Sequence, residues 1–137
     1  MSNLQNKSDI YLESAILLNK KNLYPPVAHC AYYACYQIFK HLWLYKIGKS
    51  EADLEALCKS KPREGSHEVL INQIVSHIKN SALQNKEDDS RVLNNKIGQL
   101  KKLRVLGDYK DLNFDSTCSS NAISLSNDII PILKKYQ

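Results

Sequence analysis

The chain has 137 residues, of which 43% are hydrophobic and 24% are charged, and its formal net charge is +5. These are ordinary globular values, and the length predicts one domain over residues 1–137. An all-β fold is disfavoured, because it needs a turn residue at every hairpin and the chain has only four glycines and four prolines. The positive charge permits an anionic partner but does not by itself indicate one, since the lysines are spread along the whole chain.

The first two predicted helices carry clear apolar stripes. The first helix covers residues 2–20, and its stripe consists of Leu4, Tyr11, Ala15 and Leu18. The second helix covers 25–47 and opens with two prolines, because proline in a first turn costs no helical hydrogen bond. Spacings of four and three predict its buried face, which comprises Val27, Ala31, Ala34, Ile38 and Leu42. Aromatic residues elsewhere on this helix indicate a central position: Tyr32, Tyr33, Tyr36, Phe39, Trp43 and Tyr45.

The middle of the chain is predicted to hold one short and one longer helix. Gly48 ends the second helix, and Ser50 is expected to cap a short helix over 50–58 whose early acidic residues suit a helix N-terminus. A basic loop over 59–65 follows, and Ser66 is predicted to be the N-cap of a helix over 67–81. The polar stretch 84–90, which contains the acidic cluster 87–89, is predicted to be a flexible loop.

Two long helices complete the chain. The first covers 89–109, and its inward stripe consists of Leu93, Ile97, Leu100 and Arg104. The second covers 116–136, and Pro131 is expected to bend it because proline removes a helical hydrogen bond. The predicted fold is therefore all-α, an antiparallel bundle of four long helices plus one or two short helices.

The sequence gives no sign of export, membrane insertion or metal binding. It lacks the 18 or so consecutive apolar residues of a membrane span, and its first residues do not resemble a signal peptide. None of the four cysteines forms a CxxC pair, so reduced and mostly buried thiols are expected. A cytoplasmic protein without metal or cofactor is predicted, since phosphate-binding glycine loops and zinc-protease motifs are also lacking.

Three motifs in one order resemble the HEPN superfamily. The second helix contains VAHCAYYACYQIFK, the fourth begins near SHEVL, and the fifth ends in KLRVLGDYKDL. Small bacterial HEPN proteins combine an Ala-Tyr-Tyr-Ala helix, a Ser-His helix start and an Arg-x-x-x-Asp-Tyr segment. The resemblance extends from about Leu4 to Leu133. It implies a bundle of about five helices that pairs as a homodimer.

The resemblance also implies a class of activity. Many HEPN proteins are metal-independent ribonucleases of toxin–antitoxin or phage-defence systems, and others accompany a nucleotidyltransferase. The active members carry an arginine followed by a histidine four to six positions later, in a cleft between two copies. Arg104 matches the arginine, but Tyr109 stands where the histidine is expected. Because a tyrosine with a pKa near 10 is a poor acid or base at neutral pH, this difference favours RNA binding over cleavage.

Arg104 has two interpretations. It can form a structural ion pair with Asp108 at i+4, or it can bind a phosphate with its planar guanidinium. Three nearby lysines would add positive charge to an RNA site, or they form an ordinary solvated face: Lys101, Lys102 and Lys110. Tyr109 is interpreted as a core tyrosine whose hydroxyl reaches a neighbouring helix, with a catalytic role as the alternative.

Other residues could join the same cleft. His67, with Ser66 beside it, would contribute an imidazole if its helix starts near the end of the helix that carries Arg104; the alternative is an ordinary helix start. His29 is interpreted as a satisfied interior histidine. Tyr32 and Tyr33 could stack on bases or form a dimer contact, and at least one of them is expected in the core.

Two functional hypotheses follow. The first is a HEPN-like homodimer that binds RNA or nucleotides, in a toxin–antitoxin or phage-defence context, with doubtful ribonuclease activity. The second is a non-catalytic interaction module that docks on a partner such as a nucleotidyltransferase. Arg104→Ala should weaken RNA binding only under the first hypothesis.

Overall fold

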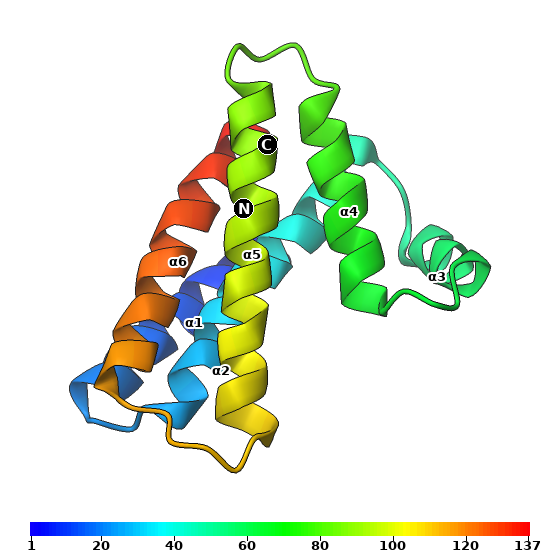
Figure 1. Cartoon of the computed structure of the whole chain (residues 1–137). Helices are drawn as coiled ribbons and strands as arrows, with labels where there is room; N and C mark the ends of the chain where they lie inside the picture. The colour runs from blue at the N-terminus through cyan, green and yellow to red at the C-terminus, as the bar shows by residue number, and fades with distance from the viewer.

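The computed structural model describes residues 1–137, and every regular element in it is helical. The predicted all-α class is thus confirmed. The elements are α1 (Asn3–Lys20), α2 (Pro25–His41), the π-helix η1 (Leu42–Ile47), α3 (Glu51–Ser60), α4 (Ser66–Lys79), α5 (Lys86–Tyr109) and α6 (Ser116–Lys135). In Figure 1, α4, α5 and α6 lie side by side in front of α1 and α2, and α3 stands apart from them.

Helix α2 is the centre of the bundle. It contacts α1, α4, α5 and α6, and the five residues predicted to form its buried face are all buried. Tyr32, Phe39 and Trp43 are buried as well, so apolar contacts surround this segment on several sides. The predicted central position is therefore confirmed, and it follows from an apolar surface too wide for one neighbouring helix to cover.

The predicted cap at Ser50 is confirmed, the predicted cap at Ser66 is wrong, and Ser2 caps α1, which was not predicted. The Ser2 and Ser50 hydroxyls accept hydrogen bonds from the Gln5 and Asp53 amides, and in both cases the side chain of the third helical residue accepts from the serine amide. Ser66 is not an N-cap: Gly65 holds that position, and Ser66 is the first residue of α4. Glycine is an acceptable N-cap, so the helix begins one residue earlier than predicted.

The predicted flexible loop over 84–90 is also wrong. Helix α5 already begins at Lys86, which places Glu87, Asp88 and Asp89 in its first turn. Negative charges there are favourable because they face the positive end of the helix dipole. Asp89 is buried and accepts hydrogen bonds from Tyr136 and Lys135, so this start is anchored to the end of the chain.

The second predicted helix changes character near its end. Residues 42–47 form a π-helix, in which the Gly48 amide donates to the Trp43 carbonyl, and Gly48 then ends the helix with a φ of 79°. Only glycine adopts this left-handed conformation without a steric cost, so the predicted end at Gly48 is confirmed. Pro131 lies inside α6, which continues beyond it to Lys135.

Two further observations concern the chemistry of the chain. All four cysteines are free thiols; Cys35 is buried, whereas the other three are partly exposed, so the expected burial holds for only one of them. No three His, Cys, Asp or Glu side chains are grouped to hold a metal ion.

None of the helices combines the length and the apolar character that crossing a membrane requires.

Candidate functional site: an arginine set among aromatic rings

Three helices bring polar and aromatic side chains together beside the second half of α5. Helix α2 contributes Tyr32, Tyr33 and Tyr36, and the first turn of α4 contributes His67. We call these four side chains the aromatic cluster. The centroids of the Tyr36 and His67 rings are 4.1 Å apart, and those of Tyr32 and His67 are 5.8 Å apart with nearly parallel planes. Spacings of three and four on α2 place Tyr32, Tyr33 and Tyr36 on neighbouring parts of its surface.

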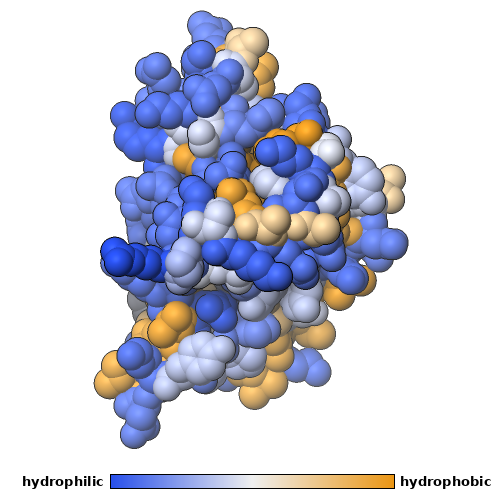
Figure 2. All heavy atoms as spheres, turned by 90° about the vertical axis from the view of Figure 1, so that its right-hand side faces the viewer, coloured by the Kyte–Doolittle hydropathy of each residue, from blue (hydrophilic) through white to orange (hydrophobic).

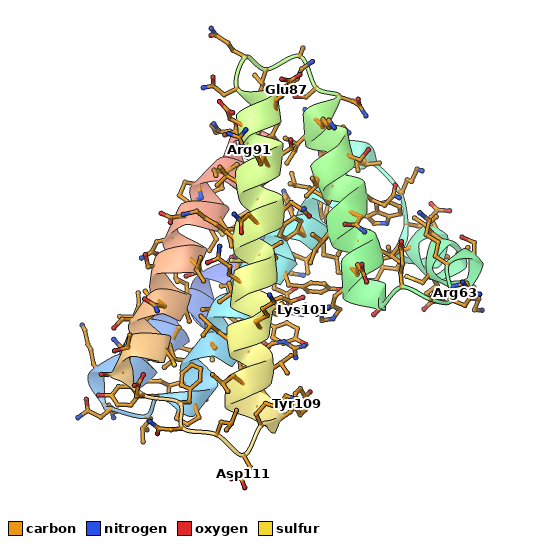
Figure 3. All side chains as sticks on the ribbon, in the orientation of Figure 1. Arg63, Glu87, Arg91, Lys101, Tyr109 and Asp111 are labelled. Atoms are coloured by element: carbon orange, nitrogen blue, oxygen red, sulfur yellow. The ribbon has the colours of Figure 1, made fainter.

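Arg104 of α5 lies against this cluster. Its guanidinium carbon is 4.9 Å from the centroid of the Tyr32 ring, 5.8 Å from that of Tyr33 and 5.9 Å from that of Tyr109. These distances are within the range of cation–π attraction, which holds the guanidinium in place without using its N–H groups. Figure 3 shows Lys101 and Tyr109 along the same half of α5, with aromatic rings beside the helix between them.

The hydrogen-bonding capacity of Arg104 is largely unused. Its side chain is only 12% exposed, and its one ionic contact joins Nη1 to Asp108 Oδ2 over a long 3.8 Å. The Nε atom is buried and has no hydrogen-bond partner. An arginine has five N–H donors, and burying them without acceptors is costly. The ion pair predicted from the i+4 spacing exists, but it is long and leaves Nε without an acceptor.

Asp108 has a closer partner than Arg104. Its Oδ2 lies 2.9 Å from His29 Nδ1, on α2. The interpretation of His29 as a satisfied histidine is therefore confirmed, but its side chain is 42% exposed, so an interior position is wrong.

The surroundings of His67 favour its neutral form. Burial, and next to it the positive charges of Arg104, Lys101 and Lys40, lower the pKa of His67. The ring nitrogen Nδ1 is 3.0 Å from the Tyr32 hydroxyl. Burial also raises the pKa of Tyr32, so this hydroxyl keeps its proton. The cluster itself therefore carries no negative charge that would neutralise Arg104.

The prediction for Tyr109 is wrong. Its side chain does not reach into the core: the residue is 72% exposed. Tyr109 is the last residue of α5, where the neighbouring helices no longer cover the surface. Its ring instead lies beside the Arg104 guanidinium and offers a flat exposed surface.

The remaining predicted site residues separate into two groups. Lys101 is close enough to influence the pKa of His67. Ser66 is exposed and forms no side-chain cap at the start of α4. Lys102 and Lys110, together with Lys101, line a hollow on the outer face of α5, next to Val105 and Leu112. Of the two core alternatives, Tyr32 is fully buried and Tyr33 is partly exposed.

Sequence reasoning missed two contributors to this site. Tyr36 packs on His67, and its i+4 spacing from Tyr32 could have revealed it. The pairing of His29 with Asp108 joins residues 79 positions apart, and no local pattern indicates it. Together the site offers a held cation with free donors, a neutral imidazole and an exposed ring, a set that suits a phosphate next to a stacked base.

Compared with protein-family models, with curated proteins and with solved structures, the chain finds no match. The resemblance to HEPN proteins therefore rests on the three motifs of the sequence.

Proposed function

We propose that the protein binds RNA through Arg104, as a HEPN-like homodimer in a toxin–antitoxin or phage-defence setting. The observation that carries this proposal is the unused donor capacity of a nearly buried arginine. A guanidinium held by aromatic rings loses little further conformational entropy when it binds a phosphate, because its position is already fixed.

The surroundings of Arg104 favour RNA over a simple anion. Tyr109 presents an exposed ring next to the guanidinium, where an unpaired base can stack while its phosphate contacts Arg104. Stacking on an aromatic ring stabilises a bound base by about 1–3 kcal/mol. Lys101 adds a positive charge on the same half of α5 (Figure 3).

The residues support RNA binding without the RNA cleavage typical of HEPN ribonucleases. Tyr109 replaces the histidine that the motif requires, and a tyrosine hydroxyl keeps its proton near neutral pH. His67 is neutral but lies against Tyr32 and Tyr36, within the aromatic cluster. The paired copy proposed for the homodimer would place a second Arg104 in the same RNA-binding surface.

The test compares two arginines of one helix. Arg104→Ala should weaken the binding of a short single-stranded RNA at least tenfold, measured by fluorescence anisotropy. Arg91→Ala is the matched control, since Arg91 is exposed at the opposite end of α5 (Figure 3) and pairs only with Asp88. The loss of one phosphate contact should also reduce the slope of log affinity against log salt by about 0.7.

Equal affinities of the Arg104→Ala and Arg91→Ala variants would refute the proposal, provided that both remain folded by circular dichroism. Arg104→Lys separates charge from shape: a lysine keeps the charge but lacks the planar fork, so intermediate affinity is expected. The same titrations with inorganic phosphate distinguish an RNA site from a site for any small anion.

A further inference from the structure

The outer face of α5, turned away from the core, combines apolar side chains with lysines. A hollow of about 640 Å³ lies along it, lined by Gly98, Lys101, Lys102, Val105, Leu106, Lys110 and Leu112. It adjoins a second hollow of about 540 Å³ between α5 and α6, and both share Lys102 and Leu106. We call the first hollow the outer groove. Leu112 is 69% exposed, so part of this apolar surface faces solvent directly.

Gly98 is the first indication that a helix packs in the outer groove. It lies near the middle of the 24-residue α5, where glycine lowers helix stability by roughly 0.5–1 kcal/mol relative to alanine. A Cβ atom at this position would meet no other atom within 4 Å. The fold itself therefore does not require glycine here. The absence of a side chain leaves room for a second backbone to approach α5 closely.

The charges around the groove indicate the chemistry of the occupant. Lys101, Lys102 and Lys110 line it, and none of them belongs to an ion pair of the protein. By contrast, Lys96 in the adjoining hollow is paired with Asp128 at 2.6 Å. An apolar floor between unpaired lysines fits a ligand with an apolar stripe and acidic flanks.

From these observations we infer that the outer groove binds an amphipathic, acidic helix of another protein. The helix would cross α5 at Gly98 and place its apolar residues on Val105, Leu106 and Leu112. Residues 98–109 of α5 extend over about 16 Å, which accommodates a partner helix whose anchors at i, i+4 and i+7 extend over about 10 Å, or two turns. Acidic residues beside these anchors would pair with the three lysines.

A second copy of this chain fits the groove less well. In a twofold contact the same surface of both copies meets, so the three unpaired lysines of each copy would be brought into one interface. Like charges placed together at an interface oppose association. Neither Arg104 nor the aromatic cluster lines the groove, although Lys101 adjoins both the groove and the Arg104 site.

The experiment uses a displayed library of helical peptides of about 20 residues, long enough to form a helix. Every member carries leucines at i, i+4 and i+7, and each flanking position is randomised between Glu and Lys. Selection on the full-length protein should enrich Glu at the flanks. The best peptide should then bind the Gly98→Leu variant at least tenfold more weakly, because the new side chain fills the groove. In a double variant with Lys102→Glu and Lys110→Glu, selection should enrich Lys instead of Glu at the flanking positions.

Gly98→Leu also provides the internal control. It introduces a better helix former at a position with open space, so the thermal midpoint of the variant should not fall. Its affinity for RNA should remain unchanged, which separates this inference from the proposed RNA function. The inference is overturned if Glu is not enriched, if the peptide binds Gly98→Leu as tightly as the wild type, or if Gly98→Leu converts a dimer into a monomer in sedimentation.

Discussion

His29 Nδ1 and Asp108 Oδ2 lie 2.9 Å apart, and this contact joins the start of α2 to the end of α5. Asp108 is thereby held at a distance from Arg104, with 3.8 Å between Oδ2 and Nη1. The Asp108 carboxylate is close enough to attract the guanidinium but does not satisfy all of its N–H donors. It also competes with any phosphate that approaches Arg104.

Asp108→Asn should therefore strengthen RNA binding several-fold. The substitution removes a negative charge next to the bound phosphate and leaves a side chain of similar size. It should also lower the free energy of unfolding by about 1–3 kcal/mol, because the Arg104 and Asp108 side chains are only 12% and 18% exposed and Arg104 loses its one ionic contact. Anisotropy titrations and urea denaturation measure the two quantities. A large loss of stability with unchanged RNA affinity would show that the Arg104–Asp108 pair is purely structural.

The stability of the protein should fall as the pH drops below about 6.5. The pKa of His67 is lowered in the folded state by burial and by Arg104, whereas in the unfolded chain it is near 6.5. The unfolded chain therefore takes up the proton first, and the stabilisation present above pH 6.5 is lost as the pH falls through the folded pKa. His67→Gln should flatten this dependence, as measured by urea midpoints between about pH 7.5 and 5.5.

His41 provides the comparison for this measurement. Burial and the nearby amino terminus also lower the pKa of His41, so part of the slope should remain in His67→Gln. Adding His41→Gln should remove most of the remainder. If the slope of the His67→Gln variant equals that of the wild type, His67 is not the titrating group.

The end of the chain should contribute measurably to stability through Tyr136. This residue is 4% exposed, and its hydroxyl donates to Asp89 Oδ2 at 2.6 Å. Tyr136→Phe should reduce the free energy of unfolding by about 1.5 kcal/mol, at the lower end for a hydrogen bond to a charged group, because Lys135 still contacts the carboxylate. Tyr45→Phe is the control, since Tyr45 is 66% exposed. Equal losses in both variants would contradict this account.

Two glycines of α5 should respond to alanine in opposite directions. At Gly107 a Cβ would lie 2.5 Å from the Pro25 carbonyl oxygen, so Gly107→Ala should destabilise the protein by about 1–3 kcal/mol as α2 and α5 are forced apart. Gly98→Ala should stabilise it by about 0.5–1 kcal/mol, because the position has open space. Urea denaturation of both variants tests the contrast, and a shared sign would refute it.

The spacing of apolar residues predicted the helices well, because the residues on the buried face of a helix recur every three to four positions. The stripe of α2 is buried throughout, and that of α5 is buried up to Leu100. The next position of the α5 stripe is Arg104. At this residue the stripe leaves the apolar core and the candidate site begins. The pattern thus indicated the place of the site, although it could not show whether Asp108 satisfies the arginine.

The errors have a common physical origin in the ends of helices. The residues 87–89 resemble a polar loop in the sequence, yet the helix dipole and the partners of Asp89 favour a helix there. The large aromatic side chain of Tyr109 is of a type often found in cores, but it lies where α5 ends and no neighbouring helix covers it. Such positions depend on where other elements stop, which is not encoded in the local sequence.

Helix α3 is held more weakly than its neighbours, since none of its residues is buried and its packing is mainly against α4. Figure 2, which views this side of the molecule, shows mostly hydrophilic atoms with separate apolar patches. Segments with few buried contacts open without global unfolding. Trypsin should therefore cut the native protein first after the exposed residues Lys59, in the last turn of α3, and Arg63, in the turn that follows, while the remaining helices stay protected. The same weak attachment makes the exposed turn 61–63, directly after α3, the natural place to insert a tag or reporter, because insertions are tolerated best at exposed turns.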